Sequence, residues 1–218
     1  MEEKKYLKAP KIRGVKVPHY KLTENEETKP LLKPKKVTLV MSQHIGAPAT
    51  VCVEKGEQVF VGTRVGAANG FISADVHSSV SGKVTNIVTV LTPQGQHIQA
   101  VEVESDGEFK IDPSITPPTV TDAESLVAAI ARSGLVGLGG AGFPTNVKLA
   151  VPKGVEVDTL VINGAECEPY ITSDYREMME NPDDIVEGII RVKKLLGLKR
   201  AIVGIESKTP EAIMLLRE

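Results

Sequence analysis

The chain has 218 residues, of which 41% are apolar and 25% charged, and its formal net charge is −2. This composition predicts a globular protein with one large domain or two small ones. Positive and negative side chains are interspersed without a basic stripe, which argues against nucleic-acid binding. No stretch reaches the roughly 18 apolar residues of a membrane span, and the charged start lacks the apolar core of a secretory signal. We therefore expect a cytosolic chain.

The cysteines and histidines predict no metal site. Cys52 and Cys167 have no metal-ligand spacing, so neither a disulfide framework nor an iron–sulfur cluster is expected from them. We expect Cys167 to be a packed small residue. The histidines are scattered along the chain: His19, His44, His77 and His97. Ordinary polar or half-buried roles are expected for them, and we assign no catalytic residue and no metal ligand.

The first half of the chain predicts an extended arm followed by a small all-β unit. Residues 1–36 mix Lys, Glu, Pro and Gly with few apolar positions, which predicts the arm. Over residues 37–105, short β-rich runs alternate with glycines and charged residues. The predicted strands are Val37–Met41, Thr50–Val53, Gln58–Val61, Gly82–Val90 and His97–Val103.

One part of the all-β unit resembles a carrier domain. Val76 to Val84 is similar to the second half of a biotinyl or lipoyl domain, which is a barrel-sandwich hybrid. Such carriers attach their cofactor to a lysine at a hairpin tip. The corresponding position falls at about Phe71, which has no amine to acylate. A swinging-arm role is therefore disfavoured.

A proline-rich linker separates this unit from the second half. Pro113, Pro117 and Pro118 break both helices and central strands, so residues 106–120 are expected to be the linker. Beyond it, Thr121-Asp-Ala-Glu124 predicts a capping box that opens a helix, and Gly134 suits the end of that helix.

Residues 121–218 predict an α/β domain. A strand at 157–162, a helix at 181–197 and a strand at 200–205 predict parallel pairing with a right-handed crossover. Another helix is predicted to begin at Thr209. A domain with only two clear strands looks incomplete, so we expect this domain to be truncated at its C-terminus.

The loop from Gly134 to Thr145 contains Gly137-x-Gly139-x-x-Gly142, the spacing of the dinucleotide fingerprint. A Rossmann fingerprint follows a strand, whereas this loop follows a predicted helix, so the usual context is absent. Glycines still allow backbone N–H groups to approach a phosphate or a flat ring. A turn that serves packing alone is the alternative. Lys148 could reach an anion held by the loop, although most lone lysines are solvated surface charges.

A second motif, Asn163-Gly-Ala-Glu-Cys-Glu-Pro169, follows a buried strand, at the edge where open α/β sheets bind ligands. Glu166 and Glu168 are two residues apart and would face the same side of an extended backbone. They could accept hydrogen bonds from ribose hydroxyls or a nicotinamide amide. Alternatively, they are loop charges that pair with Arg176 or Lys148.

Three segments together resemble the N-terminal half of the RnfC subunit of the Rnf electron transport complex. They are Ser42–Pro48, Gly137–Thr145 with Lys148, and Asn163–Asp174 with Arg176. The α/β part is also similar to the flavin-carrying, NADH-oxidising subunit of respiratory complex I. Leu138, Ala165 and Cys167 stand where that subunit has Arg, Asp and Ser.

The resemblance implies a site for FMN and NAD(H). Its residues would be Gly137, Gly139, Gly140, Gly142, Phe143, Lys148, Asn163, Glu166 and Glu168. The glycines and Lys148 would bind FMN and the nucleotide phosphates, Phe143 would lie against NAD(H), and Glu168 would contact the nicotinamide end. Iron–sulfur clusters are implied only for a later, missing region. We therefore expect this chain alone to be inactive and to bind FMN weakly or not at all.

The function that the resemblance implies is electron transfer in a membrane-bound, ion-translocating NADH:ferredoxin oxidoreductase. The chain would lie in the cytoplasm, peripheral on the inner face of the cell membrane. Its partners would be the membrane subunits of the Rnf complex and, indirectly, ferredoxin. Two alternatives stay open: a soluble relative that supplies electrons to a cobalamin enzyme or an amino-acid reductase, and a non-catalytic scaffold module.

Overall fold

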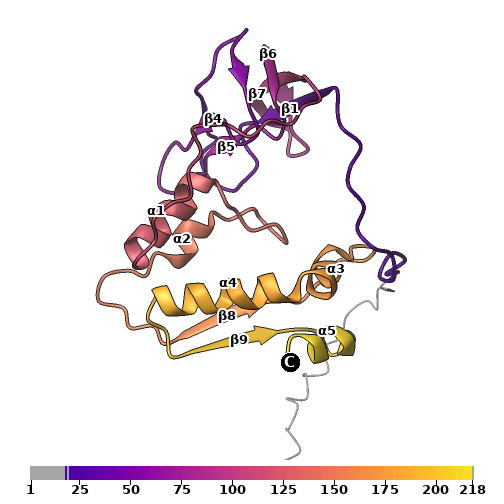
Figure 1. Cartoon of the computed structure of the whole chain (residues 1–218), viewed down its shortest axis with the longest axis vertical. Helices are drawn as coiled ribbons and strands as arrows, with labels where there is room; N and C mark the ends of the chain where they lie inside the picture. Colours follow the sequence, from indigo (N-terminus) through magenta and orange to yellow (C-terminus); the bar gives the residue numbers. More distant parts are fainter. Residues whose placement is uncertain (1–17, 19, 218) are drawn as a thin grey trace, which may run out of the picture.

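Figure 1 shows a computed structural model that describes residue 18 and residues 20–217. A strand-rich unit lies at one end of the molecule, and a parallel strand pair with helices lies at the other. Two helices, α1 (Ala123–Ser133) and α2 (Thr145–Leu149), lie between them. Residues 20–35 form neither helix nor strand and run from the second unit to the first. The predicted arm is thus extended where it is described; residues 1–17 and His19 lie outside the described residues.

Seven strands form two antiparallel sheets in the strand-rich unit. The larger sheet has the order β1 (Lys36–Val40), β7 (His97–Ser105), β6 (Gly82–Leu91) and β3 (Gln58–Val59). The smaller sheet has the order β2 (Thr50–Val51), β4 (Arg64–Ala67) and β5 (Val76–His77). All five predicted strands are present, with β2 and β3 shorter than expected. Strands β4 and β5 were not predicted, because two to four residues show too little alternation to identify a strand.

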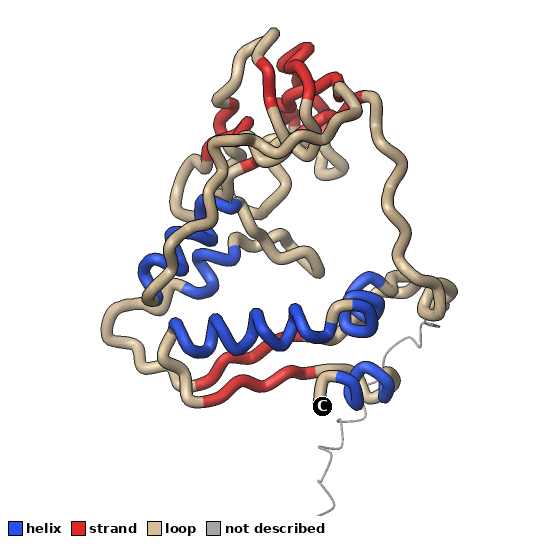
Figure 2. Tube along the Cα trace, in the orientation of Figure 1, coloured by secondary structure: helices blue, strands red, loops and turns tan. Residues whose placement is uncertain are grey.

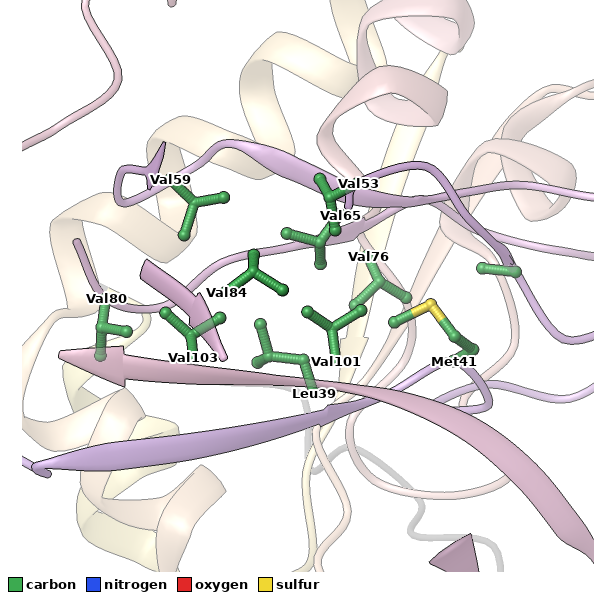
Figure 3. Close-up of a cluster of buried hydrophobic side chains, with 11 residues drawn as sticks. Leu39, Met41, Val53, Val59, Val65, Val76, Val80, Val84, Val101 and Val103 are labelled. Atoms are coloured by element: carbon green, nitrogen blue, oxygen red, sulfur yellow. The ribbon is translucent and has the colours of Figure 1, made fainter. Parts of the chain in front are cut away.

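The hydrophobic core of this unit lies between the two sheets and consists mostly of valine (Figure 3). β-branched side chains suit this place because they pack well on a pleated surface. The buried cluster contains Leu39, Met41, Ala49, Val53, Val59, Val65, Val76, Val80, Val84, Val101 and Val103.

Helix α1 begins one residue later than predicted. Its N-cap is Asp122, whose carboxylate accepts a hydrogen bond from Ser125 N (2.8 Å), while Ser125 Oγ accepts one from Asp122 N (3.1 Å). The predicted box with Thr121 and Glu124 is therefore wrong by one residue. Asp, Ser and Thr are all good capping residues, so the capping chemistry alone does not fix the first residue of the helix. The helix ends as expected at Gly134, which has a φ of 68°.

The second unit contains one parallel pair, β8 (Thr159–Asn163) and β9 (Arg200–Gly204). Helix α4 (Pro182–Leu195) connects them and lies along the pair in Figure 2. The predicted strand–helix–strand unit with parallel pairing is confirmed. Two short helices flank the carboxyl ends of these strands: α3 (Ser173–Glu180), which was not predicted, and α5 (Pro210–Leu215), which follows Thr209 as expected.

Burial is much lower in the second unit than in the first. Val161 on β8 is 68% exposed and Ile202 on β9 is 46% exposed, whereas the valines of the first core are below 7%. The buried apolar residues of this unit are Met178, Leu198 and Ala212. None of the described helices has the length and apolar character needed to cross a lipid bilayer.

Candidate functional site

The glycine loop, residues 135–144, connects α1 to α2 and extends into the space between the two units (Figure 2). Two backbone hydrogen bonds close its base, from Gly137 N to Phe143 O (2.9 Å) and from Thr145 N to Leu135 O (3.0 Å). The loop thus lies between two helices, as predicted, and is not a Rossmann strand-to-helix turn.

Gly142 attaches this loop to the strand-rich unit. It has a φ of +65°, and a Cβ there would lie 3.0 Å from Gln43 O and from His44 Cα. Its carbonyl accepts a hydrogen bond from Ile45 N (3.3 Å). Both the left-handed backbone and the close approach require glycine at this position.

His44 holds the segment that Gly142 contacts. It is buried, its Nε2 accepts a hydrogen bond from Ala74 N (3.1 Å), and its Nδ1 lies 3.1 Å from Ile45 O. Since a carbonyl only accepts and a backbone N–H only donates, this geometry requires a neutral ring with its proton on Nδ1. His44 is therefore structural, in line with the role expected for the histidines.

Lys148 on α2 reaches back to the base of the glycine loop. A Cβ on Gly137 would lie 2.6 Å from Lys148 Nζ, so the ammonium group lies directly against this glycine. The absence of a side chain at Gly137 makes room for it. One positive charge is thus placed at the loop, where an anion held by the backbone N–H groups could also contact it.

The acidic motif follows β8. Asn163, the last residue of the strand, accepts a hydrogen bond from Ala165 N through its side chain (3.1 Å), which turns the backbone away from the strand direction. Gly164 N donates to Gly204 O at the end of β9 (2.8 Å). The motif therefore lies at the carboxyl ends of both parallel strands, as its position in the sequence predicted.

One cavity of about 610 Å³ joins the two motifs. Eight of the nine predicted site residues line it: Gly137, Gly139, Gly140, Gly142, Phe143, Lys148, Asn163 and Glu168. Its volume is in the range of about 300–1,000 Å³ that is usual for small-molecule sites. Cys167 also lines the cavity and is exposed, so the expectation of a packed small residue is wrong. The turn after Asn163 directs its side chain outward.

Glu166 does not line this cavity. Its side chain is 7% exposed and accepts hydrogen bonds from Asp174 N (2.8 Å) and Lys21 Nζ (3.4 Å). The two carboxylates therefore do not face the same side, because the backbone turns after β8 instead of staying extended. The alternative pairing also differs from the prediction: Arg176 binds Glu180 (2.7 Å), and the partner of Glu166 is Lys21.

The wall opposite the glycine loop is acidic. It contains Glu168, Asp174 and Glu177, and burial, followed by the charges of Glu166 and Glu168, raises the pKa of Asp174. Asp174 and Glu177 were not among the predicted site residues and lie on the unpredicted helix α3; the only signal for Asp174 was its place in a segment of the resemblance. Carboxylates on this wall can accept hydrogen bonds from hydroxyl or amide groups, while the opposite wall suits phosphates.

Two known domain families match the chain. Residues 130–218 match the Nuo51 FMN-binding domain, and residues 11–108 match the RnfC barrel sandwich hybrid domain. The RnfC-type subunit of the Na⁺-translocating ferredoxin:NAD⁺ oxidoreductase complex from Acetobacterium woodii is 45% identical over 184 residues. The chain belongs to the RnfC family. The predicted pair of folds, a barrel-sandwich hybrid followed by an α/β flavin-binding domain of the complex I type, is therefore confirmed.

Other RnfC proteins are similar over most of the chain. The corresponding subunit of the proton-translocating complex of Clostridium ljungdahlii is 39% identical over 203 residues, and that of the ion-translocating complex of Rhodobacter capsulatus is 37% identical over 199 residues. The alignments cover 83–91% of this chain but only 38–44% of these relatives. The chain thus spans less than half of the length of the RnfC relatives that it matches.

Proposed function

We propose that this chain binds FMN and NAD(H) and exchanges electrons between them, as part of the RnfC subunit of an ion-translocating ferredoxin:NAD⁺ oxidoreductase. One observation carries the proposal. Eight residues from two motifs that are about 20 positions apart line one cavity, inside the segment that matches an FMN-binding domain. The wall formed by Gly137 and Lys148 fits a flavin phosphate because it combines accessible backbone with one positive charge.

Each group of residues has a distinct task in this proposal. The glycine loop and Lys148 bind the FMN and nucleotide phosphates, Phe143 lies against the nicotinamide dinucleotide, and Glu168 accepts a hydrogen bond at its nicotinamide end. Bound FMN supplies the exchange between two-electron and one-electron transfer. The chain's residues orient the two ring systems and limit the access of water to them.

The setting of this site is also part of the proposal. Residues 37–105 form the barrel-sandwich domain, residues 106–120 link it to the α/β domain, and residues 121–218 contribute part of the flavin domain. Iron–sulfur clusters outside these 218 residues accept the electrons, and the protein lies on the inner face of the cell membrane beside the membrane subunits. The names of the relatives as subunits of ion-translocating complexes support this setting.

Titrations with FMN and NADH test the proposal, on the chain and on the longer RnfC protein that contains it. We expect Lys148→Ala to weaken FMN binding by about tenfold, since a charge-assisted hydrogen bond is worth about 1.5–3 kcal/mol. Lys153→Ala is the matched control, because Lys153 is exposed and does not line the cavity. Flavin fluorescence and NADH-dependent bleaching are the measurements.

The same experiment separates the alternatives. If neither protein binds FMN or NADH, and Lys148→Ala and Glu168→Gln change nothing, the chain is a scaffold module. If the longer protein co-purifies with a soluble cobalamin enzyme or amino-acid reductase and not with membrane subunits, the ion-translocating assignment is wrong.

A further inference from the structure

The N-terminal segment of residues 20–28, called the strap below, crosses from the strand-rich side to α3 and the loop before it (Figure 1). At its start, Lys21 Nζ donates hydrogen bonds to three backbone carbonyls, those of Glu166 (3.1 Å), Glu168 (3.0 Å) and Ile171. It also lies 3.4 Å from the Glu166 carboxylate. The Lys21 side chain is only 13% exposed, so this ammonium group is largely removed from water.

Further hydrogen bonds attach the rest of the strap. Thr28 binds the Glu180 carboxylate twice, through its backbone N–H (2.9 Å) and through its hydroxyl. The other bonds join Thr23 Oγ1 to Thr172 Oγ1 (2.6 Å) and Arg176 Nη1 to Glu24 O (3.0 Å). The strap is therefore fixed along its whole length to the acidic loop and to α3.

Two tyrosines add a contact of a different kind. The rings of Tyr20 and Tyr170 stack with their centroids 5.2 Å apart and their planes inclined by 8°. Both residues have a positive φ, 47° for Tyr20 and 69° for Tyr170, which large side chains rarely adopt. Such backbone conformations persist where surrounding contacts determine them, and here those contacts come from the strap.

The position of Lys21 explains how the strap affects the cavity. Four oxygen atoms converge on one ammonium group, and without it they would face one another with no donor between them. Glu166 also accepts from Asp174 N, so a shift of Glu166 moves the start of α3. Glu168 and Asp174, which line the cavity, lie on either side of this point.

We propose that Lys21 is a positioning residue, which through the strap holds the acidic wall of the cavity in the arrangement that binds NAD(H). The cavity's ligand is taken from the proposed function, on which this inference rests. Lys21 contacts the loop from the face opposite the cavity and does not line it. Its removal therefore changes the binding of a ligand that it does not touch.

Hydrogen exchange without any ligand tests the strap. In Lys21→Met, we expect the amides of residues 165–174 to exchange at least about tenfold faster, because their loop opens locally. The amides of the valine core should be unchanged. Lys29→Met is the matched control, since Lys29 is an exposed lysine just beyond the strap. Equal exchange of residues 165–174 in Lys21→Met and in the wild-type protein would overturn the inference.

Chemical rescue tests the role of the ammonium group itself. In Lys21→Ala, we expect NADH to bind about tenfold more weakly, and methylammonium to restore the binding in part, because its N–H groups can reach the same four oxygen atoms. Tetramethylammonium has the same charge and no N–H donor, so it should not restore binding. Equal rescue by both cations, or no loss of NADH binding, would contradict the inference.

Two outcomes need a second measurement. If the Lys21 variants do not fold, Thr28→Val, which removes one hydroxyl from the strap, should show the same faster exchange at α3 to a smaller extent; unchanged exchange would overturn the inference. If the wild-type protein binds neither FMN nor NADH, the proposed function fails. The exchange experiment still decides whether the strap holds the loop.

Discussion

Glu166 and Glu168 have different surroundings although one residue separates them. Glu166 is buried against Lys21 and Asp174 N, whereas Glu168 is exposed in the cavity. We expect Glu166→Gln to lower the free energy of unfolding by about 1–3 kcal/mol, because the amide NH₂ group presents a donor to two other donors. Glu168→Gln should change it by less than about 0.5 kcal/mol and weaken NADH binding. Urea unfolding and NADH titration of both variants would show this; equal losses of stability would contradict it.

Glu180 predicts how the strap responds to pH. The hydroxyl and the backbone N–H of Thr28, followed by Arg176, lower the pKa of Glu180 from 4.5 to about 2. Because the folded state favours the ionised carboxylate, the contribution is fully present above pH 4.5 and is lost as the pH falls toward 2.

The difference in stability between the wild-type protein and Thr28→Val isolates this contribution. We expect the difference to be constant above pH 5 and to shrink as the pH falls toward 2. Urea unfolding across this pH range measures it. A difference that does not depend on pH would show that the hydrogen bond to Glu180 adds nothing to stability.

At the scale of elements, the glycine loop is held by one of its glycines in particular. Gly142→Ala puts a Cβ on a left-handed residue, 3.0 Å from Gln43 O, and should cost about 1–2 kcal/mol of stability. Gly140→Ala is the matched control, because a Cβ there meets nothing within 4 Å. Thermal unfolding would measure both. A loss of stability in Gly140→Ala as large as that in Gly142→Ala would contradict the role of the Gly142 contact.

The two units of the molecule should respond differently to the loss of an apolar side chain. Val101 is fully buried in the first core, so Val101→Ala should cost about 2 kcal/mol. Val161 is 68% exposed, and Val161→Ala should cost less than about 0.5 kcal/mol. Chemical unfolding of both variants tests this; similar costs would mean that Val161 is covered in solution.

At the scale of the whole molecule, the cysteines report on the cavity. Cys167 lines the cavity, whereas Cys52 lies in the strand-rich unit, and both are exposed. We expect FMN or NADH to slow the alkylation of Cys167 by iodoacetamide and to leave that of Cys52 unchanged. Burial raises the pKa of the Cys52 thiol, so each cysteine is compared with itself, with and without ligand. Equal protection of both would contradict a local site.

The sequence predicted those parts of the fold whose signals are local. Alternation identified the long strands, and the periodicity of residues 157–205 identified the parallel pair with its helix. The short elements β4, β5 and α3 were missed, because each is too short for its periodicity to stand out. The capping box was displaced by one residue for a related reason, since neighbouring Thr and Asp residues can both cap.

For the site, the sequence by itself determined the residue types and their order: a glycine loop with a lysine after it, and an acidic motif at a strand end. Only the tertiary structure decided which of these residues share a cavity. It brought eight of them together and turned Glu166 toward Lys21, which lies 145 residues earlier in the chain. Local spacing does not encode such a contact, because the chain must fold before a distant ammonium group can compensate the burial of a carboxylate.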